Sequence, residues 1–172
     1  MPLAAWTNFY VITGSAAGAL TGLTFVVITL IAQTPLGAVE QGTAAYTTPT
    51  IVQFAAVLFV CMYLGAPWPA LVPPAVLLGL TGLAGIVYTG IVVRRQRRLE
   101  EYEAVLEDLL AYGAGPLVAY TALLVAGILL PEMPGSALFV VGGALMLLLF
   151  VAIHNAWDLV TFITMQGITH EH

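Results

Sequence analysis

The chain has 172 residues, of which 60% are hydrophobic and only 8% are charged, and its formal net charge is −5. A soluble domain carries about 25% charged residues, so this composition excludes an ordinary soluble globule. The four cations exclude nucleic-acid binding through a broad basic surface. The single cysteine excludes a disulfide framework and a thiolate metal cage. These exclusions leave an integral membrane protein, with the lipid bilayer as its surroundings.

Charge-free stretches predict how the chain crosses the bilayer. No Asp, Glu, Lys or Arg occurs in 1–39, 41–93, 109–131 or 133–157. About 20 apolar residues cross the hydrocarbon core as a helix, and lipid-exposed backbone favours helices because they satisfy their own hydrogen bonds. The stretch 41–93 holds two crossings, because a proline cluster interrupts its middle. The sequence predicts one all-α transmembrane domain over 1–172, with spans at 9–31, 51–66, 75–93, 115–130 and 137–157, the last continuing as helix to about 165. The short second span has an alternative, partly re-entrant form.

The arginines predict the orientation. All four lie in the connection 94–114, directly after the third span. Cytoplasmic loops carry the excess of Lys and Arg, so we expect this connection inside, the N-terminus outside and the C-terminus in the cytoplasm of a bacterial inner membrane. Apolar residues at helical spacing within the connection predict a short amphipathic helix, which either caps the bundle at the headgroups or docks a partner. They are Leu99, Tyr102, Leu106 and Leu109.

Small residues predict where helices pack closely. Gly14, Gly18 and Gly22 recur every four residues in the first span. In lipid the hydrophobic effect does not drive helices together, and rows of small residues allow the close backbone contact that does. The third span has a similar row, formed by Thr81, Gly85 and Thr89, and the two rows are candidates to face each other. The partner of the first row is either a helix of the same chain or another subunit.

Two segments carry a resemblance. The stretch NFYVITGSAAGALTGLTFVVIT, from Asn8 to Thr29, and the later IHNAWDLVTFI resemble segments of small, uncharacterised bacterial multi-pass membrane proteins. This resemblance covers about a quarter of the chain. It implies a membrane location and no particular chemistry.

Polar residues within apolar segments are the candidate functional residues, because burying them is costly unless they are paired. The fifth span contains His154, Asn155, Asp158 and Thr161, and the second span contains Gln53. A carboxylate one turn from an imidazole suits a proton or cation relay near neutral pH. The alternative is interfacial anchoring, because helical rise places His154 and Asp158 about 26 and 31 Å along the span, near the cytoplasmic boundary.

The same depth argument predicts a charge clamp. Arg94 lies about 29 Å along the third span, level with Asp158. We therefore expect Asp158 to pair with Arg94 or Arg95, unless the carboxylate faces water and the arginines extend to lipid phosphates.

No enzyme, metal site or cofactor is expected. Ser15 and His154 lie about 16 Å apart in depth, too far for a nucleophile and its base. The favoured function is a homo-oligomeric channel or simple transporter for a small ion or solute. The alternative is a scaffold or accessory subunit that packs against another membrane complex. The absence of charge at mid-membrane disfavours a charge-coupled pump.

Overall fold

The computed structural model describes residues 2–32, 40–99 and 113–169, and these residues are almost entirely helical, with no strand among them. A short 3-10 helix, η1, leads into the first long helix. The elements are η1 (Pro2–Trp6), α1 (Thr7–Ala32), α2 (Glu40–Leu64), α3 (Val72–Leu99), α5 (Gly115–Leu129) and α6 (Pro134–Thr169). The prediction of an all-α chain is therefore confirmed for the described residues.

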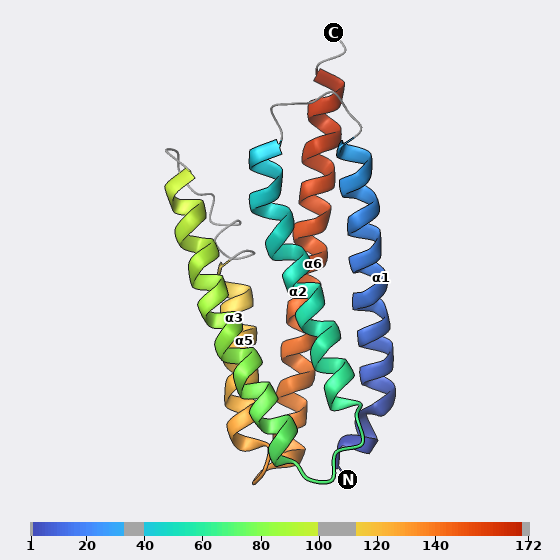
Figure 1. Cartoon of the computed structure of the whole chain (residues 1–172), viewed down its shortest axis with the longest axis vertical. Coiled ribbons are helices and arrows are strands. Elements are labelled where there is room, and N and C mark those ends of the chain that lie inside the picture. The colour runs from blue at the N-terminus through green and yellow to red at the C-terminus, as the bar shows by residue number, and fades with distance from the viewer. Residues whose placement is uncertain (1, 33–39, 100–112, 170–172) are drawn as a thin grey trace.

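The helices run up and down along one axis (Figure 1). One group consists of α1, α2 and α6, each of which packs against the other two. A second group consists of α3 and α5, which form the most extensive helix pair. The groups join mainly where α5 packs against α6. Because α5 is much shorter than its neighbours, it accompanies only the lower part of α3 in Figure 1.

Prolines explain most of the helix boundaries. Proline is tolerated in the first turn of a helix, where its missing N–H has no intrahelical partner. It occurs there in α3, in α5 and in α6. The second helix differs from its prediction, because it begins at Glu40 and passes through Pro49. The helix therefore extends well before the predicted start of the second span at 51.

Three helices are long and apolar enough to cross a membrane. They correspond to the first, third and fifth predicted spans and cover Pro2–Thr29, Val72–Arg95 and Pro134–Asp158. The other two predicted spans correspond to shorter apolar helices, Thr48–Leu64 and Gly115–Leu129.

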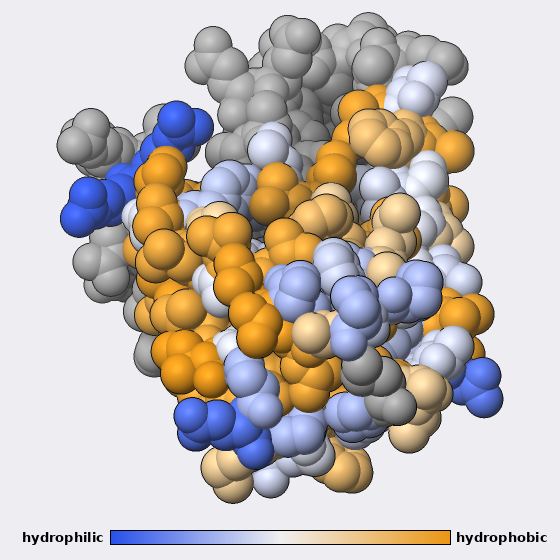
Figure 2. Space-filling model, turned by 60° about the horizontal axis from the view of Figure 1, so that its bottom comes forward, coloured by the Kyte–Doolittle hydropathy of each residue, from blue (hydrophilic) through white to orange (hydrophobic). Residues whose placement is uncertain are grey.

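The surface of the bundle is as apolar as its interior. Large hydrophobic side chains, such as Ile12, Ile128 and Phe139, point outward along every long helix. Seen from the end that carries the N-terminus, apolar residues cover the flanks and more polar residues gather at that end (Figure 2). Soluble proteins rarely expose apolar surface on this scale, whereas lipid-facing helices do.

Candidate functional site

The predicted polar group on α6 is divided between two faces of the helix. Asn155 is completely buried. His154 and Asp158 are about half exposed, and His154 Nε2 lies 3.1 Å from Asp158 Oδ2. The Thr161 hydroxyl donates to the backbone oxygens of Trp157 and Asp158. The imidazole and carboxylate therefore pair as expected, but on the outer face rather than inside the bundle.

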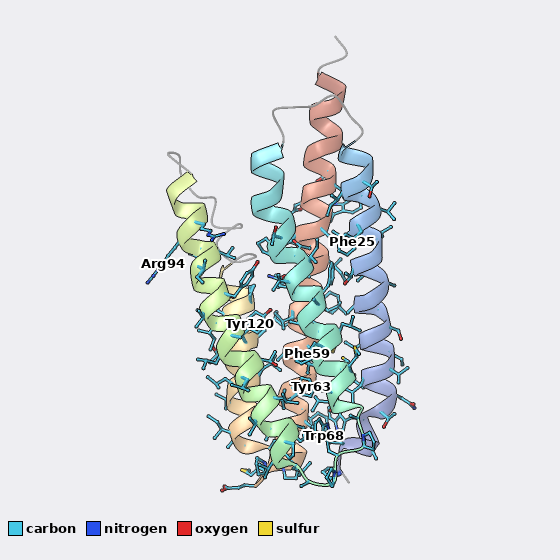
Figure 3. The ribbon with its side chains drawn as sticks, in the orientation of Figure 1. Phe25, Phe59, Tyr63, Trp68, Arg94 and Tyr120 are labelled. Carbon is cyan, nitrogen blue, oxygen red and sulfur yellow. The ribbon has the colours of Figure 1, made fainter. Side chains whose placement is uncertain are left out.

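The predicted clamp between Asp158 and the arginines is not formed among the side chains that the structure describes. The carboxylate pairs with His154, and no ion pair joins it to Arg94 or Arg95. Arg94 lies on the outer side of α3, remote from α6 (Figure 3). The helix α3 packs mainly against α5 and not against α6, so its arginines are not brought to Asp158.

Two buried amides face the interior from neighbouring helices. Gln53 of α2 is 3% exposed and Asn155 of α6 is 0% exposed. The Gln53 Oε1 atom has no hydrogen-bond partner, and neither does Asn155 Nδ2 or Oδ1. Since α2 packs directly against α6, these groups belong to one interior.

Two side-chain contacts fix the relative heights of α1, α2 and α6. The Trp6 ring lies 2.8 Å from the position that a Cβ would take on Gly142 of α6. Cys61 Cβ of α2 lies 2.9 Å from the corresponding position on Gly14 of α1. The first contact joins α6 to η1, which leads directly into α1, and the second joins α1 to α2.

Helical rise from these contacts places the two amides at one level of the bundle. Asn155 lies about 20 Å above Gly142 along α6. Gln53 lies about 24 Å above the same level, counted along α1 and then along α2. The amides are therefore within about two helical turns of each other along the axis. We call Gln53 and Asn155 the amide site.

Threonines add further oxygen atoms near this level. Thr24 of α1 and Thr50 of α2 are both buried. The Thr24 hydroxyl donates to the Leu20 carbonyl of its own helix at 2.8 Å. A hydroxyl bonded in this way keeps acceptor capacity. The surroundings of the amide site thus offer polar atoms from α1, α2 and α6.

The amide site is energetically costly as it stands. A buried polar group without a partner loses its hydration and gains nothing in return, at a cost of about 1–3 kcal/mol. Five such atoms remain among the described residues: the three amide atoms and the hydroxyl oxygens of Tyr10 and Tyr63.

Tyr10 and Tyr63 are the interior polar residues that sequence reasoning missed as site candidates. Both are buried, Tyr10 on α1 and Tyr63 on α2. The Tyr63 hydroxyl faces Thr81 of α3 without a hydrogen bond of good geometry. Aromatic residues near a membrane boundary look like interfacial anchors, so only the inward direction of these rings reveals them.

The two small-residue rows have different partners. In the α1 row, a Cβ on Gly14 would lie 2.9 Å from Cys61 Cβ and a Cβ on Gly18 would lie 3.9 Å from Leu58 Cδ1. A Cβ on Gly22 would have no atom within 4 Å. The α1 row therefore packs on α2, and only through its first half.

The row on α3 packs on α5 instead. A Cβ on Gly85 would lie 2.1 Å from the Tyr120 ring. The hydroxyls of Thr81 and Thr89 donate to carbonyls of their own helix. The two rows therefore do not form the common interface that was predicted.

One further prediction concerns residues beyond the part of the chain that the structure describes. The amphipathic helix around Tyr102 and Leu106 falls in 100–112, outside the described residues. Within the described residues, no group of three His, Cys, Asp or Glu side chains is placed to hold a metal ion.

Comparison of the chain with protein-family models, with curated proteins and with solved structures gives no match. The resemblance to small bacterial multi-pass proteins therefore stays a prediction.

Proposed function

We propose that the chain is a membrane-embedded bundle of five spanning helices, with the N-terminus outside and the C-terminus in the cytoplasm. The three long apolar helices support a membrane location. The two shorter helices pack along the long ones, which supports their crossing as well. The arginines at the end of α3 support the orientation, because they lie at the end where α1 and α2 connect and where α6 ends.

Within this membrane setting, the function that the geometry supports best is that of a channel or simple transporter for a small ion or solute. The amide site carries this proposal, because unpartnered amide atoms from two packed helices face the interior. Polar groups inside a membrane protein that do not form hydrogen bonds between helices are typical of a permeation path.

Transport is tested with the purified chain in liposomes loaded with a panel of small ions and solutes. We expect release of at least one of them, and we expect Asn155→Leu and Gln53→Leu to reduce it. Asn8→Leu is the matched control, because Asn8 is exposed at the N-terminal end of α1. Release equal to that of empty liposomes for every species tested would contradict the proposal.

The alternative is an accessory subunit of a larger membrane complex. The observation that favours it is the open second half of the α1 row, where Gly22 is exposed and meets nothing within 4 Å. A small-residue surface of this kind can receive a helix of another chain, including a second copy. Extraction of the chain from its native membrane in mild detergent tests this, since an accessory subunit is recovered with stoichiometric partners. Homo-oligomeric assembly stays a prediction.

A further inference from the structure

Two pairs of unpartnered polar side chains lie at different levels inside the bundle. The amide site is the upper pair, and we call Tyr10 and Tyr63 the tyrosine site. Both Gln53 and Tyr63 belong to α2, and Tyr63 lies about 15 Å further along this helix. Figure 3 shows Tyr63 well below the level of Phe25, towards the end of the bundle that carries Trp68.

An apolar layer separates the two sites. Val57 and Val60 of α2 lie between Gln53 and Tyr63 and are completely buried. Leu145 and Leu148 of α6 are also completely buried, at heights between those of Gly142 and Asn155. The interior along α2 therefore alternates from polar to apolar to polar.

The unpartnered atoms define the chemistry of a fitting ligand. Asn155 Nδ2 donates, Gln53 Oε1 and Asn155 Oδ1 accept, and the tyrosine hydroxyls do both. A cation would satisfy the acceptors and leave the donor directed at positive charge, while an anion would do the reverse. No charged side chain is buried among those that the structure describes, so nothing there offsets the charge of an ion.

From this pattern we infer that the permeant species is a small uncharged molecule with both hydrogen-bond donors and acceptors, of the kind represented by water, urea and glycerol. This inference rests on the proposed transport function and narrows its substrate. Such a molecule binds at both polar sites and crosses the apolar layer at the cost of a few hydrogen bonds. An ion would have to shed its hydration there, which is far more costly.

The first part of the experiment is a comparison of permeant species in proteoliposomes of the parent chain. Stopped-flow light scattering measures swelling in urea and in glycerol, and a potential-sensitive dye measures K⁺ flux in the same vesicles. We expect urea or glycerol permeability above that of empty vesicles, with no K⁺ flux. Flux of K⁺ without flux of urea or glycerol overturns the inference but leaves the transport proposal standing. Absence of all flux overturns both.

The second part removes single hydroxyl groups. Tyr10→Phe and Tyr63→Phe delete hydroxyls that make no hydrogen bond of good geometry, so we expect the fold to lose little stability. If each hydroxyl forms one hydrogen bond with the permeant molecule, its removal should lower solute permeability about tenfold. Tyr120→Phe is the matched control, because Tyr120 is a buried tyrosine in the α3–α5 interface whose hydroxyl is not among the unpartnered atoms.

Thermal unfolding in detergent separates function from folding in these variants. We expect unchanged unfolding temperatures for the two Phe variants together with reduced permeability. Full permeability in both variants, with urea flux intact, overturns the role of the tyrosine site. An equal fall in solute permeability in the Tyr120→Phe control also overturns this role, because the effect is then not specific to the unpartnered hydroxyls.

Discussion

Gly82 of α3 lies directly against the backbone of Leu124 in α5. A Cβ on Gly82 would fall 2.5 Å from the Leu124 nitrogen and 2.7 Å from the Tyr120 carbonyl oxygen. Backbone atoms cannot move aside as the end of a flexible side chain can. The α3–α5 pair therefore depends on a residue without a side chain at this position, as expected where helices associate within lipid.

The first prediction follows from this contact. We expect Gly82→Ala to destabilise the chain by about 1–3 kcal/mol, because the added methyl group forces the two helices apart. Gly90→Ala is the matched control on the same helix, since no atom lies within 4 Å of its Cβ position. Thermal unfolding in detergent, followed by circular dichroism, measures both. Equal unfolding temperatures for the two variants would contradict the close packing.

The α1 row allows a second comparison. Gly14→Leu should lower the unfolding temperature, because Cys61 Cβ lies 2.9 Å from the position of the new Cβ. Gly22→Leu should leave it unchanged, because that position is open. A change of particle size in Gly22→Leu, measured by light scattering in detergent, would show that the open half of the row is an interface between chains.

The amide site gives a prediction about stability. Asn155→Leu removes two unpartnered polar atoms and keeps the branched shape of the side chain, so we expect it to stabilise the chain by about 1–3 kcal/mol. The free energy of unfolding in detergent checks this. Loss of stability instead would show that the amide is held by a bound molecule in the folded state.

The exposed pair His154 and Asp158 on α6 should contribute little to the stability of the chain. Because His154 and Asp158 are each about half exposed, we expect Asp158→Asn to change the free energy of unfolding by less than about 1 kcal/mol. A double-mutant cycle of Asp158→Asn with Arg94→Gln should show no coupling. Measurable coupling would restore a clamp between α3 and α6.

The orientation is tested by labelling a single cysteine. Gln96→Cys, made in a Cys61→Ala background, lies in the last part of α3, beside the arginines. We expect a membrane-impermeant maleimide to label it from the cytoplasmic side alone. Labelling of intact cells from outside would reverse the proposed topology.

The helices were predictable because apolar runs and prolines are local signals. The ends of α3, α5 and α6 lie within a few residues of the predicted spans, except where helix continues into the polar connection after 93 and beyond 165. The early start of α2 was not predictable, because tolerance of Pro49 depends on surrounding packing rather than on local sequence.

The direction of each polar side chain was much less predictable. His154 and Asn155 are neighbours in sequence, yet one is exposed and the other completely buried. In soluble helices an apolar stripe marks the inward face, but in α6 apolar residues surround the helix on all sides. The choice between the two faces is made by contacts with α2 and α5, which the sequence of α6 does not contain.

The short length of α5 has a consequence for the surrounding lipid. Its 15 residues give an apolar length of about 22 Å, whereas Pro134–Asp158 of α6 gives about 37 Å. Leu117, Val118 and Ile128 of α5 are exposed, so in the proposed five-span arrangement this shorter flank meets the acyl chains directly. The hydrocarbon core is about 30 Å thick, so α5 is shorter than the core and α6 is longer than it. The bilayer should thin beside α5, or the whole bundle should tilt, so that membrane thickness itself influences how the chain sits.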